Sequence, residues 1–423
     1  MKATYYPNKT KSNQIALKEL ILVQERAIIS LLREKELTTI MVNRMILNET
    51  SYFGPGAIQE ISKEITTRKF KKALIVTDKG IVASGIVNKV TRVLDNASLA
   101  YQLFDETVPN PTIGIVKKGL TAFQASQADY IIAIGGGSPI DTAKAIGIVT
   151  TNPEFADIRS LEGEAPTKNP SVPILAIPTT SGTAAEVTIN YVITDEDNKR
   201  KFVCVDTHDI PVVAFVDSDL MLGMPKALAA ATGMDALTHA IEGYITLGAW
   251  EMSDMLHLKA IEIIASSLRA SVAGEASARE AMALGQYIAG MGFSNVGLGL
   301  VHGMAHPLGA WYDTPHGVAN AILLPTIMAY NQDFTGEKYR DIALAMGVEN
   351  SLTMSLAEVR QAAVAAVYQL GVDVGIPTTL TEVGFQGNDI EAIAKDALAD
   401  VCTGGNPRAA TVEDIANLYR SLL

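Results

Sequence analysis

The stretch YIIAIGGGSPID, Tyr130–Asp141, joins an apolar run to three consecutive glycines and to a segment that continues with helical spacing. An uninterrupted apolar run of this kind is typical of a strand buried on both faces of a parallel sheet. The glycines let the backbone approach a pyrophosphate, to which the N-terminus of the next helix offers free N–H groups. A glycine turn after a strand is a weak indication by itself, since an ordinary tight turn explains it about as well.

Three similar apolar runs lie in the first half of the chain: KALIVTD (72–78), VPILAIPTT (172–180) and VVAFVD (212–217). Segments 85–97 and 111–126 between them carry apolar residues at helical spacing. This alternation predicts an α/β region built on a parallel sheet, in which the loops after the strands carry the ligand.

The second half of the chain lacks such strand runs. Beyond about Met224 the apolar residues recur at helical spacing, which predicts an all-helical region. We therefore expect an α/β domain over residues 41–223 and a helical domain over residues 224–423, with a cleft between them. The helical patterns cover residues 235–245, 253–268, 278–293, 317–330, 356–370 and 412–423.

Composition and charge narrow the class of protein. Apolar residues make up 48% of the 423 residues and charged ones 19%, which is a globular composition. The net charge of −12 argues against a nucleic-acid partner and against an anionic membrane surface. No apolar run is long enough to cross a bilayer. The two cysteines, Cys204 and Cys402, have no metal-binding spacing and suit a reducing cytoplasm as packing residues.

Two further features of the first half suit a dinucleotide. The loop PTTSGTAAE (178–186) follows a predicted strand and carries four hydroxyl groups. Asp78 ends another strand, where a carboxylate can accept hydrogen bonds from a ribose diol and would repel a 2′-phosphate, so NAD is favoured over NADP. This acid precedes the glycines, unlike in the usual Rossmann fingerprint, so a standard GxGxxG domain is not expected. The alternative is that Asp78 only caps the following helix.

The second half holds four of the six histidines in a pattern that suits a metal ion. Asp235 and His239 are four residues apart, which places both on one face of a helix, and His302 and His306 repeat this spacing. His316 follows just past a predicted turn. Asp235 with three of these histidines would form a four-ligand site for Fe(II) or Zn(II). Each histidine taken alone is better explained as a packing residue, but the cluster favours a metal.

The remaining two histidines are interpreted as packing or surface residues. His208 has Cys204, Asp206 and Asp209 nearby, but strand alternation would scatter these side chains over both faces. His257 lies in a helical pattern without an acidic or histidine partner one turn away. Neither is expected to bind a metal.

GGGSPID, IPTTSGTAAEVT, GMDALTHAIEGY and GLVHGMAHPLGAWYDTPHG together resemble the iron-dependent (group III) alcohol dehydrogenases. The resemblance runs from about Asn43 through CTGGNPR (402–408) to the C-terminus. Residues 1–40 have no counterpart in that family, and their segment 15–32 has the spacing of an amphipathic helix. We expect these 40 residues to be an extension outside the family core.

The resemblance implies a role for individual residues. It places the metal ligands at Asp235, His239, His302 and His316, and an additional active-site histidine at His306. Phe293 and Cys402 match positions that line the substrate pocket. The NAD contacts would be Asp78, Asn110, Gly136, Gly137, Ser138, Thr179, Thr180 and Lys201.

The implied function is reversible hydride transfer between NAD and a small neutral alcohol, with lactaldehyde and 1,2-propanediol as the expected pair. Ethanol, glycerol or butanol would be alternatives within the same chemistry. The resemblance also implies Fe²⁺, with Zn²⁺ as the alternative, and a homodimer. We hypothesise that His306 relays the proton to the substrate oxygen.

Two other classes of protein are less consistent with the sequence. Dehydroquinate synthase-like proteins share the architecture but bind phosphorylated substrates, whereas the motifs here have few Lys and Arg residues nearby. A non-enzymatic docking protein would leave the metal and cofactor residues unexplained.

Overall fold

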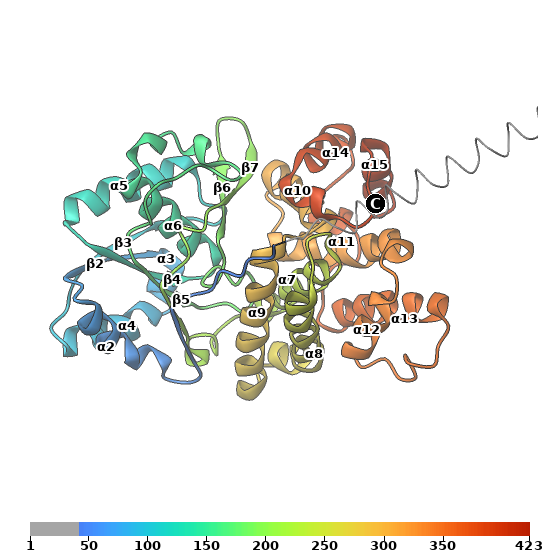
Figure 1. Ribbon diagram of the computed structural model, residues 1–423, viewed down its shortest axis with the longest axis horizontal. Coiled ribbons are helices and arrows are strands. Elements are labelled where there is room, and N and C mark those ends of the chain that lie inside the picture. The colour runs from blue at the N-terminus through green and yellow to red at the C-terminus, as the bar shows by residue number, and fades with distance from the viewer. Residues whose placement is uncertain (1–41) are drawn as a thin grey trace, which may run out of the picture. The chain divides into compact units, whose positions relative to one another are not determined.

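The computed structural model describes residues 42–423 (Figure 1). The chain divides into two units, Met1–Arg44 and Met45–Leu423, of which the second is compact. The extension over residues 1–40 and its expected helix at 15–32 lie outside the described residues. All helices and strands of the described residues belong to the unit Met45–Leu423.

The first half of this unit is built on a six-stranded sheet in which every strand pair is parallel. The strands follow the spatial order β1-β8-β5-β4-β2-β3. The predicted α/β fold is therefore confirmed, and the four predicted strands are β2, β4, β5 and β8. The sheet comprises β1 (Thr50–Phe53), β2 (Lys72–Asp78), β3 (Ala100–Thr107), β4 (Tyr130–Gly135), β5 (Ile174–Pro178) and β8 (Val213–Val216).

Helices cover both faces of the sheet, which explains why β4, β5 and β8 are apolar along their whole length. In β4, Ile131 and Ala133 pack on one side, whereas Ile132 and Ile134 pack on the other. The first face is covered by α5 and α6, and the second by α2 and α4. These helices are α2 (Ile61–Arg68), α3 (Lys79–Ala83), α4 (Ile86–Asn96), α5 (Ile113–Ser126) and α6 (Gly137–Thr151).

A separate antiparallel hairpin joins β6 (Asn190–Asp195) to β7 (Arg200–Val205). The sequence analysis did not predict it. Ile193, Phe202 and Cys204 of the hairpin pack into the core that lies under α5 and α6. β7 carries Lys201, one of the predicted NAD contacts.

The second half of the unit is helical, as predicted. Its helices share one continuous apolar core, and α8 and α9 pack side by side (Figure 1). The helices are α7 (Lys226–Ile245), α8 (Glu251–Ala273), α9 (Ala276–Val296), α10 (Leu300–Tyr312), α11 (His316–Asn331), α12 (Lys338–Ala345), α13 (Leu356–Asp373), α14 (Ile390–Ala399) and α15 (Val412–Arg420). Short 3₁₀ helices are η1 (Ala57–Glu60), η2 (Pro153–Phe155), η3 (Ile158–Leu161), η4 (Ser218–Leu220), η5 (Gln332–Phe334), η6 (Thr381–Val383) and η7 (Val401–Gly405).

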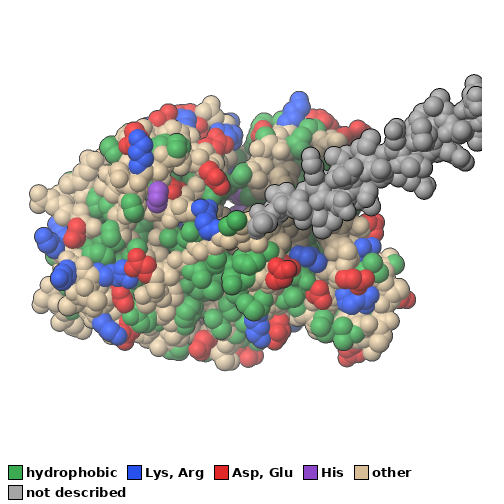
Figure 2. All heavy atoms as spheres, viewed as in Figure 1, with side chains coloured by type: hydrophobic (Ala, Val, Ile, Leu, Met, Phe, Trp, Pro, Cys, Tyr) green, Lys and Arg blue, Asp and Glu red, His purple; other side chains and the backbone are tan. Residues whose placement is uncertain are grey.

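Two observations concern the surface. None of the helices within residues 42–423 combines the length and the apolar character that crossing a membrane requires. On the face shown in Figure 2, acidic and basic side chains are interspersed, and hydrophobic ones gather near the middle, over α9.

Candidate metal and cofactor site

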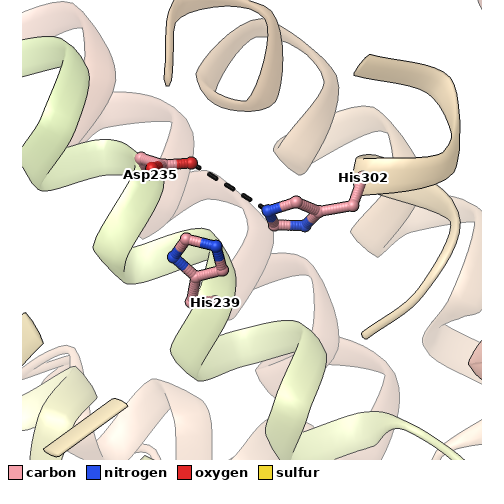
Figure 3. Close-up of side chains that lie close together, drawn as sticks. All are labelled: Asp235, His239 and His302. Carbon is pink, nitrogen blue, oxygen red and sulfur yellow. Dashed lines mark ion pairs between the residues drawn. The ribbon is translucent and has the colours of Figure 1, made fainter. Parts of the chain in front are cut away.

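Three side chains from two helices meet in the interior of the helical region. Asp235 and His239 lie one turn apart on α7, and His302 lies near the start of α10. They offer ligand atoms that all lie within 4.8 Å of one another, and all three residues are buried. Figure 3 shows the two imidazoles and the carboxylate converging, with His302 Nε2 4.0 Å from Asp235 Oδ1.

His316 brings a fourth group to this cluster from a third helix. It is the first residue of α11, and its Nε2 lies 3.6 Å from Asp235 Oδ1. Its ring centroid is 5.3 Å from that of His302. The carboxylate and the three imidazoles predicted as metal ligands are therefore side by side, although they span 82 residues of sequence, from 235 to 316.

The electrostatic environment suits a cation held by neutral imidazoles. Burial lowers the pKa of His239, and burial together with neighbouring histidines lowers those of His302 and His316 well below the ordinary value. An imidazole must be unprotonated to bind a metal. One carboxylate and three unprotonated imidazoles are the oxygen and nitrogen donors that Fe(II) and Zn(II) bind, so the residues present fit a divalent metal ion.

Two residues that the sequence analysis missed orient these groups. The buried Glu242 carboxylate accepts a hydrogen bond from the Val301 N–H at 2.6 Å and faces Nδ1 of His302. Asn320 donates from Nδ2 to Asp235 Oδ1 at 2.7 Å. A carboxylate that hydrogen-bonds the second nitrogen of a ligating histidine fixes its ring orientation. The only sequence indication of Glu242 is its position seven residues after Asp235, on the same face of α7.

A glycine next to His316 permits the close approach of α11 to α7. A Cβ atom at Gly317 would lie 2.5 Å from the backbone oxygen of Ala231 and 3.3 Å from Asp235 Cβ. Backbone cannot yield to such a contact as a flexible side chain can. Glycine at position 317 is therefore needed to bring His316 to Asp235.

The cluster opens into a cavity of about 910 Å³, part of which is open to solvent. One wall is helical, with His239, His302, His306 and His316. The opposite wall belongs to the α/β region. It includes four of the residues predicted to contact NAD, which are Asn110, Gly137, Ser138 and Lys201.

The glycine turn and the hydroxyl-rich loop lie against each other beside this cavity. Gly137 opens α6, and a Cβ there would lie 2.9 Å from the Thr183 side chain. Thr179 donates its backbone N–H to the oxygen of Gly135 at 2.9 Å. The structure thus gathers the predicted residues Gly136, Gly137, Ser138, Thr179 and Thr180 at the N-terminus of a 15-residue helix. Such a terminus provides the N–H groups that a pyrophosphate needs.

Lys201 provides the positive charge in this wall. Its Nζ donates to Asn110 Oδ1 at 2.8 Å, and Asn110 in turn donates to Asp313 Oδ1 at 3.0 Å. Burial lowers the pKa of Lys201 to about 8, because the site withholds water from the ammonium group. Among the described residues that line the cavity, no other is Lys or Arg.

Asp78 performs the capping role that the sequence analysis kept as the alternative. Its Oδ1 accepts the Ile81 N–H at 2.9 Å, which caps α3. Asp78 is not among the residues that line the cavity. Contact between Asp78 and a ribose therefore stays a prediction. The capping bond uses only Oδ1, so Oδ2 remains available to accept a hydrogen bond from the ribose.

The predicted substrate residues lie next to the cluster of predicted metal ligands. The Phe293 ring stacks on His239 with ring centroids 4.2 Å apart and 10° between the planes. Cys402 lines the cavity, as does His306. His306 Nδ1 lies 2.8 Å from Asp400 Oδ2, a carboxylate that the sequence analysis did not identify.

The other two histidines lie apart from this site. His257 is fully buried and fills the space between α7 and α9, where a Cβ at Gly243 or Gly292 would lie 2.3 Å from its Nε2. His208 contacts Thr167 Oγ1 at 2.9 Å near the surface. Neither belongs to the possible metal-binding groups found among residues 42–423.

Comparison with known proteins identifies the family. The iron-containing alcohol dehydrogenase profile matches residues 48–218, and the profile of its C-terminal domain matches residues 229–423. Lactaldehyde reductase of Escherichia coli (strain K12) is 69% identical over 381 residues, which are 90% of this chain and 100% of that protein. The 1,3-propanediol dehydrogenase of Klebsiella pneumoniae is 42% identical over 379 residues, which are 89% of this chain and 97% of that protein.

Solved structures agree with these sequence matches. A crystal structure of 1,3-propanediol oxidoreductase superposes with a TM-score of 0.87 at 42% identity, covering 90% of this chain and 100% of that one. An alcohol dehydrogenase from Oenococcus oeni also superposes with a TM-score of 0.87, at 39% identity over 90% of this chain and 100% of that one. The chain therefore belongs to the iron-containing alcohol dehydrogenase family and is an oxidoreductase of alcohols and aldehydes.

Proposed function

We propose that this protein reduces lactaldehyde to 1,2-propanediol with NADH and catalyses the reverse oxidation. The observation that carries the proposal is the buried cluster of Asp235 and three imidazoles, which opens into the same cavity as the glycine turn. The 69% identity to a lactaldehyde reductase supports this substrate over ethanol, glycerol or butanol.

We propose Asp235, His239, His302 and His316 as the ligands of an Fe²⁺ ion, with Zn²⁺ as the alternative metal. When bound, the ion polarises the substrate oxygen as a Lewis acid, and the nicotinamide supplies or takes up the hydride. The chain itself holds the reactants in place. We propose that Gly137, Ser138 and Lys201 bind the dinucleotide along one wall of the cavity. His306 holds a proton near the opposite wall, from which the substrate oxygen can receive it.

The cavity also supports a small, uncharged substrate. Near the cluster it is lined by Phe293, Leu298 and Cys402, which are apolar or weakly polar groups. A phosphorylated substrate, as in dehydroquinate synthase-like proteins, would need several basic groups, and Lys201 is already placed to face the cofactor. This distribution favours hydride transfer to a short aldehyde over a lyase reaction.

Three further expectations belong to this proposal. We propose that residues 41–223 and 224–423 act as the nucleotide-binding and metal-binding domains, and that residues 1–40 are dispensable for catalysis. We also propose a homodimer that works in the cytoplasm. Removing residues 1–40 and measuring NADH oxidation with lactaldehyde tests the second point, because full activity is expected.

A substrate panel tests the proposed reaction. Protein loaded anaerobically with Fe²⁺ is assayed for NADH oxidation with lactaldehyde, acetaldehyde, glyceraldehyde and butanal. We expect kcat/KM to be highest for lactaldehyde. A higher kcat/KM for another aldehyde would make that aldehyde the proposed substrate in place of lactaldehyde. No activity with any of the four aldehydes would contradict the proposal.

We expect Glu242→Gln to weaken metal binding by about 10- to 100-fold, because an amide replaces the carboxyl group that faces Nδ1 of His302 and orients its ring. The dissociation constant is measured by competition with a chelator. Glu251→Gln, at an exposed acid of the neighbouring helix, serves as the control and should bind the metal like the wild type. Unchanged affinity in Glu242→Gln would exclude this role.

The KM for NADH should rise with pH because of Lys201. With its pKa at about 8, the ammonium charge is present at about pH 7 and is largely lost at about pH 9. A tenfold rise is the order expected for losing one charge that contributes about 1.4 kcal/mol. Lys201→Arg keeps its charge and should show a flat profile, whereas a rise of equal size in Lys201→Arg would assign the effect elsewhere.

Asp78→Asn should increase the use of NADPH. The amide keeps an oxygen for the Ile81 N–H, so the cap of α3 is retained, while the charge that would repel a 2′-phosphate is removed. We expect the ratio of kcat/KM for NADPH to that for NADH to rise about tenfold. An unchanged ratio would leave Asp78 as a helix cap only.

A further inference from the structure

His306 and Asp400 form a buried pair at the edge of the main cavity. The two residues come from α10 and from the C-terminal end of α14, which pack against each other. His306 Nδ1 lies 2.8 Å from Asp400 Oδ2, and the side chains are only 7% and 10% exposed. His306 Nε2 makes no hydrogen bond to any described residue, and the ring lines the main cavity. One nitrogen is thus committed to Asp400, and the other remains free.

The two oxygens of Asp400 have separate partners. Oδ1 accepts the backbone N–H of Cys402 at 2.9 Å and thereby caps η7, whereas Oδ2 faces His306. Burial opposes ionisation, but the interaction with His306 and the hydrogen bond from the Cys402 backbone N–H hold the pKa of Asp400 below its ordinary value. Asp400 is therefore a carboxylate, which only accepts hydrogen bonds. Nδ1 of His306 must be the nitrogen that carries the hydrogen.

A second cavity lies behind this pair. It encloses about 460 Å³, part of it open to solvent, and is lined by both His306 and Asp400. The exposed side chains Lys199 and Arg200 also line it. Lys201 lines both cavities, so the second cavity adjoins the predicted dinucleotide site, and small solutes can reach Asp400 through it.

We propose that Asp400 is a positioning residue that fixes the ring and the tautomer of His306, so that Nε2 presents its free lone pair to the main cavity. This inference rests on the proposed function, in which His306 exchanges a proton with the substrate oxygen. In alcohol oxidation, Nε2 accepts the hydroxyl proton while Nδ1–H stays bonded to Asp400. In the reverse direction, Nε2 returns that proton to the oxygen, so no further reactant is needed.

Asp400→Asn tests the proposal with little change in shape. Its amide oxygen can still accept the Cys402 N–H, but its NH₂ group then faces His306 Nδ1 and makes that nitrogen an acceptor. The hydrogen moves to Nε2, where it blocks proton acceptance. An asparagine in place of such an aspartate is known to impose the wrong tautomer. We expect kcat to fall about 10²-fold or more, with the KM for NADH and the bound metal unchanged.

Asp389→Asn is the matched control. Asp389 precedes α14 at its other end and accepts a hydrogen bond from Tyr312 of the same α10 at 2.7 Å. The change is chemically identical, lies on the same pair of helices and leaves His306 untouched. Wild-type kinetics are expected. A loss equal to that in Asp400→Asn would show that any such change disturbs the packing of α10 on α14, and would overturn the proposal.

Chemical rescue separates positioning from folding. Asp400→Ala should be as slow as Asp400→Asn, and added formate should restore part of its kcat in a saturable manner, because the second cavity leads to the vacated position. Acetamide, which has a similar size and no charge, should not. Absence of rescue together with a lowered melting temperature would assign Asp400 a structural role only.

The tautomer of His306 can be measured by NMR without enzyme turnover, so this test does not depend on the proposed reaction. In zinc-loaded protein with ¹⁵N-labelled histidine, His306 of the wild type should show a protonated Nδ1, and His306 of Asp400→Asn a protonated Nε2. The same tautomer in both proteins overturns the inference. An enzyme that fails to reduce lactaldehyde, but shows this tautomer change, contradicts the proposed substrate and supports the positioning role.

Discussion

Asp235→Ala should lose the bound metal and about 10³-fold or more of the rate of NADH oxidation. The carboxylate is the only anionic group of the proposed ligand set and the partner of Asn320. Its removal leaves three neutral imidazoles for a doubly charged ion. Lewis-acid polarisation of the substrate oxygen contributes several kcal/mol to such a reaction, and each 1.4 kcal/mol corresponds to a factor of ten.

Metal content by mass spectrometry and kcat are measured on the same preparation. Asp219→Ala, at an exposed position of η4, is the control and should keep both the metal and the rate. A metal-free Asp235→Ala protein that keeps the wild-type rate would remove the metal from the mechanism. A metal-loaded, fully active variant would remove Asp235 from the ligand set.

His306→Ala should lower kcat by about 10²- to 10⁴-fold while the metal stays bound, because it removes the proposed proton relay but none of the four proposed ligands. A lower kcat with the metal still bound would distinguish His306 from the proposed ligand His302, which lies one turn earlier on α10. The measurements are kcat as a function of pH and metal content.

His208→Ala is a suitable control, because His208 is a partly exposed histidine that contacts Thr167 and lies apart from the cluster. An unchanged kcat and pH profile in His306→Ala would exclude the relay. Loss of metal from that variant would instead make His306 a ligand.

Local sequence pattern was sufficient for the central part of the fold. The strands around β4 are buried on both faces, so their apolar runs are unmistakable. By contrast, β3 lies at the edge of the sheet and is largely exposed, and in the hairpin of β6 and β7 the burial of β6 alternates along the strand. Polar residues interrupt β3, β6 and β7, so these strands lack the continuous apolar run that identifies β4, β5 and β8 in the sequence.

The site shows a similar division. Helical spacing predicts that Asp235 lies beside His239 and that His302 lies beside His306. It does not predict that these two pairs meet in space. Nothing local in the sequence reveals the residues that orient them, because Glu242 and His302 are 60 residues apart, and His306 and Asp400 are 94 apart. Such contacts depend on how α7, α10 and α14 pack.

An anaerobic titration of metal-free protein with Fe²⁺ tests the central claim most directly. Bound iron and the rate of NADH oxidation with lactaldehyde are measured at each addition. The rate should rise in proportion to bound iron and reach its maximum at one ion per chain, because Asp235, His239, His302 and His316 form one cluster. A full rate without metal, or no rate with one ion bound per chain, would contradict the claim.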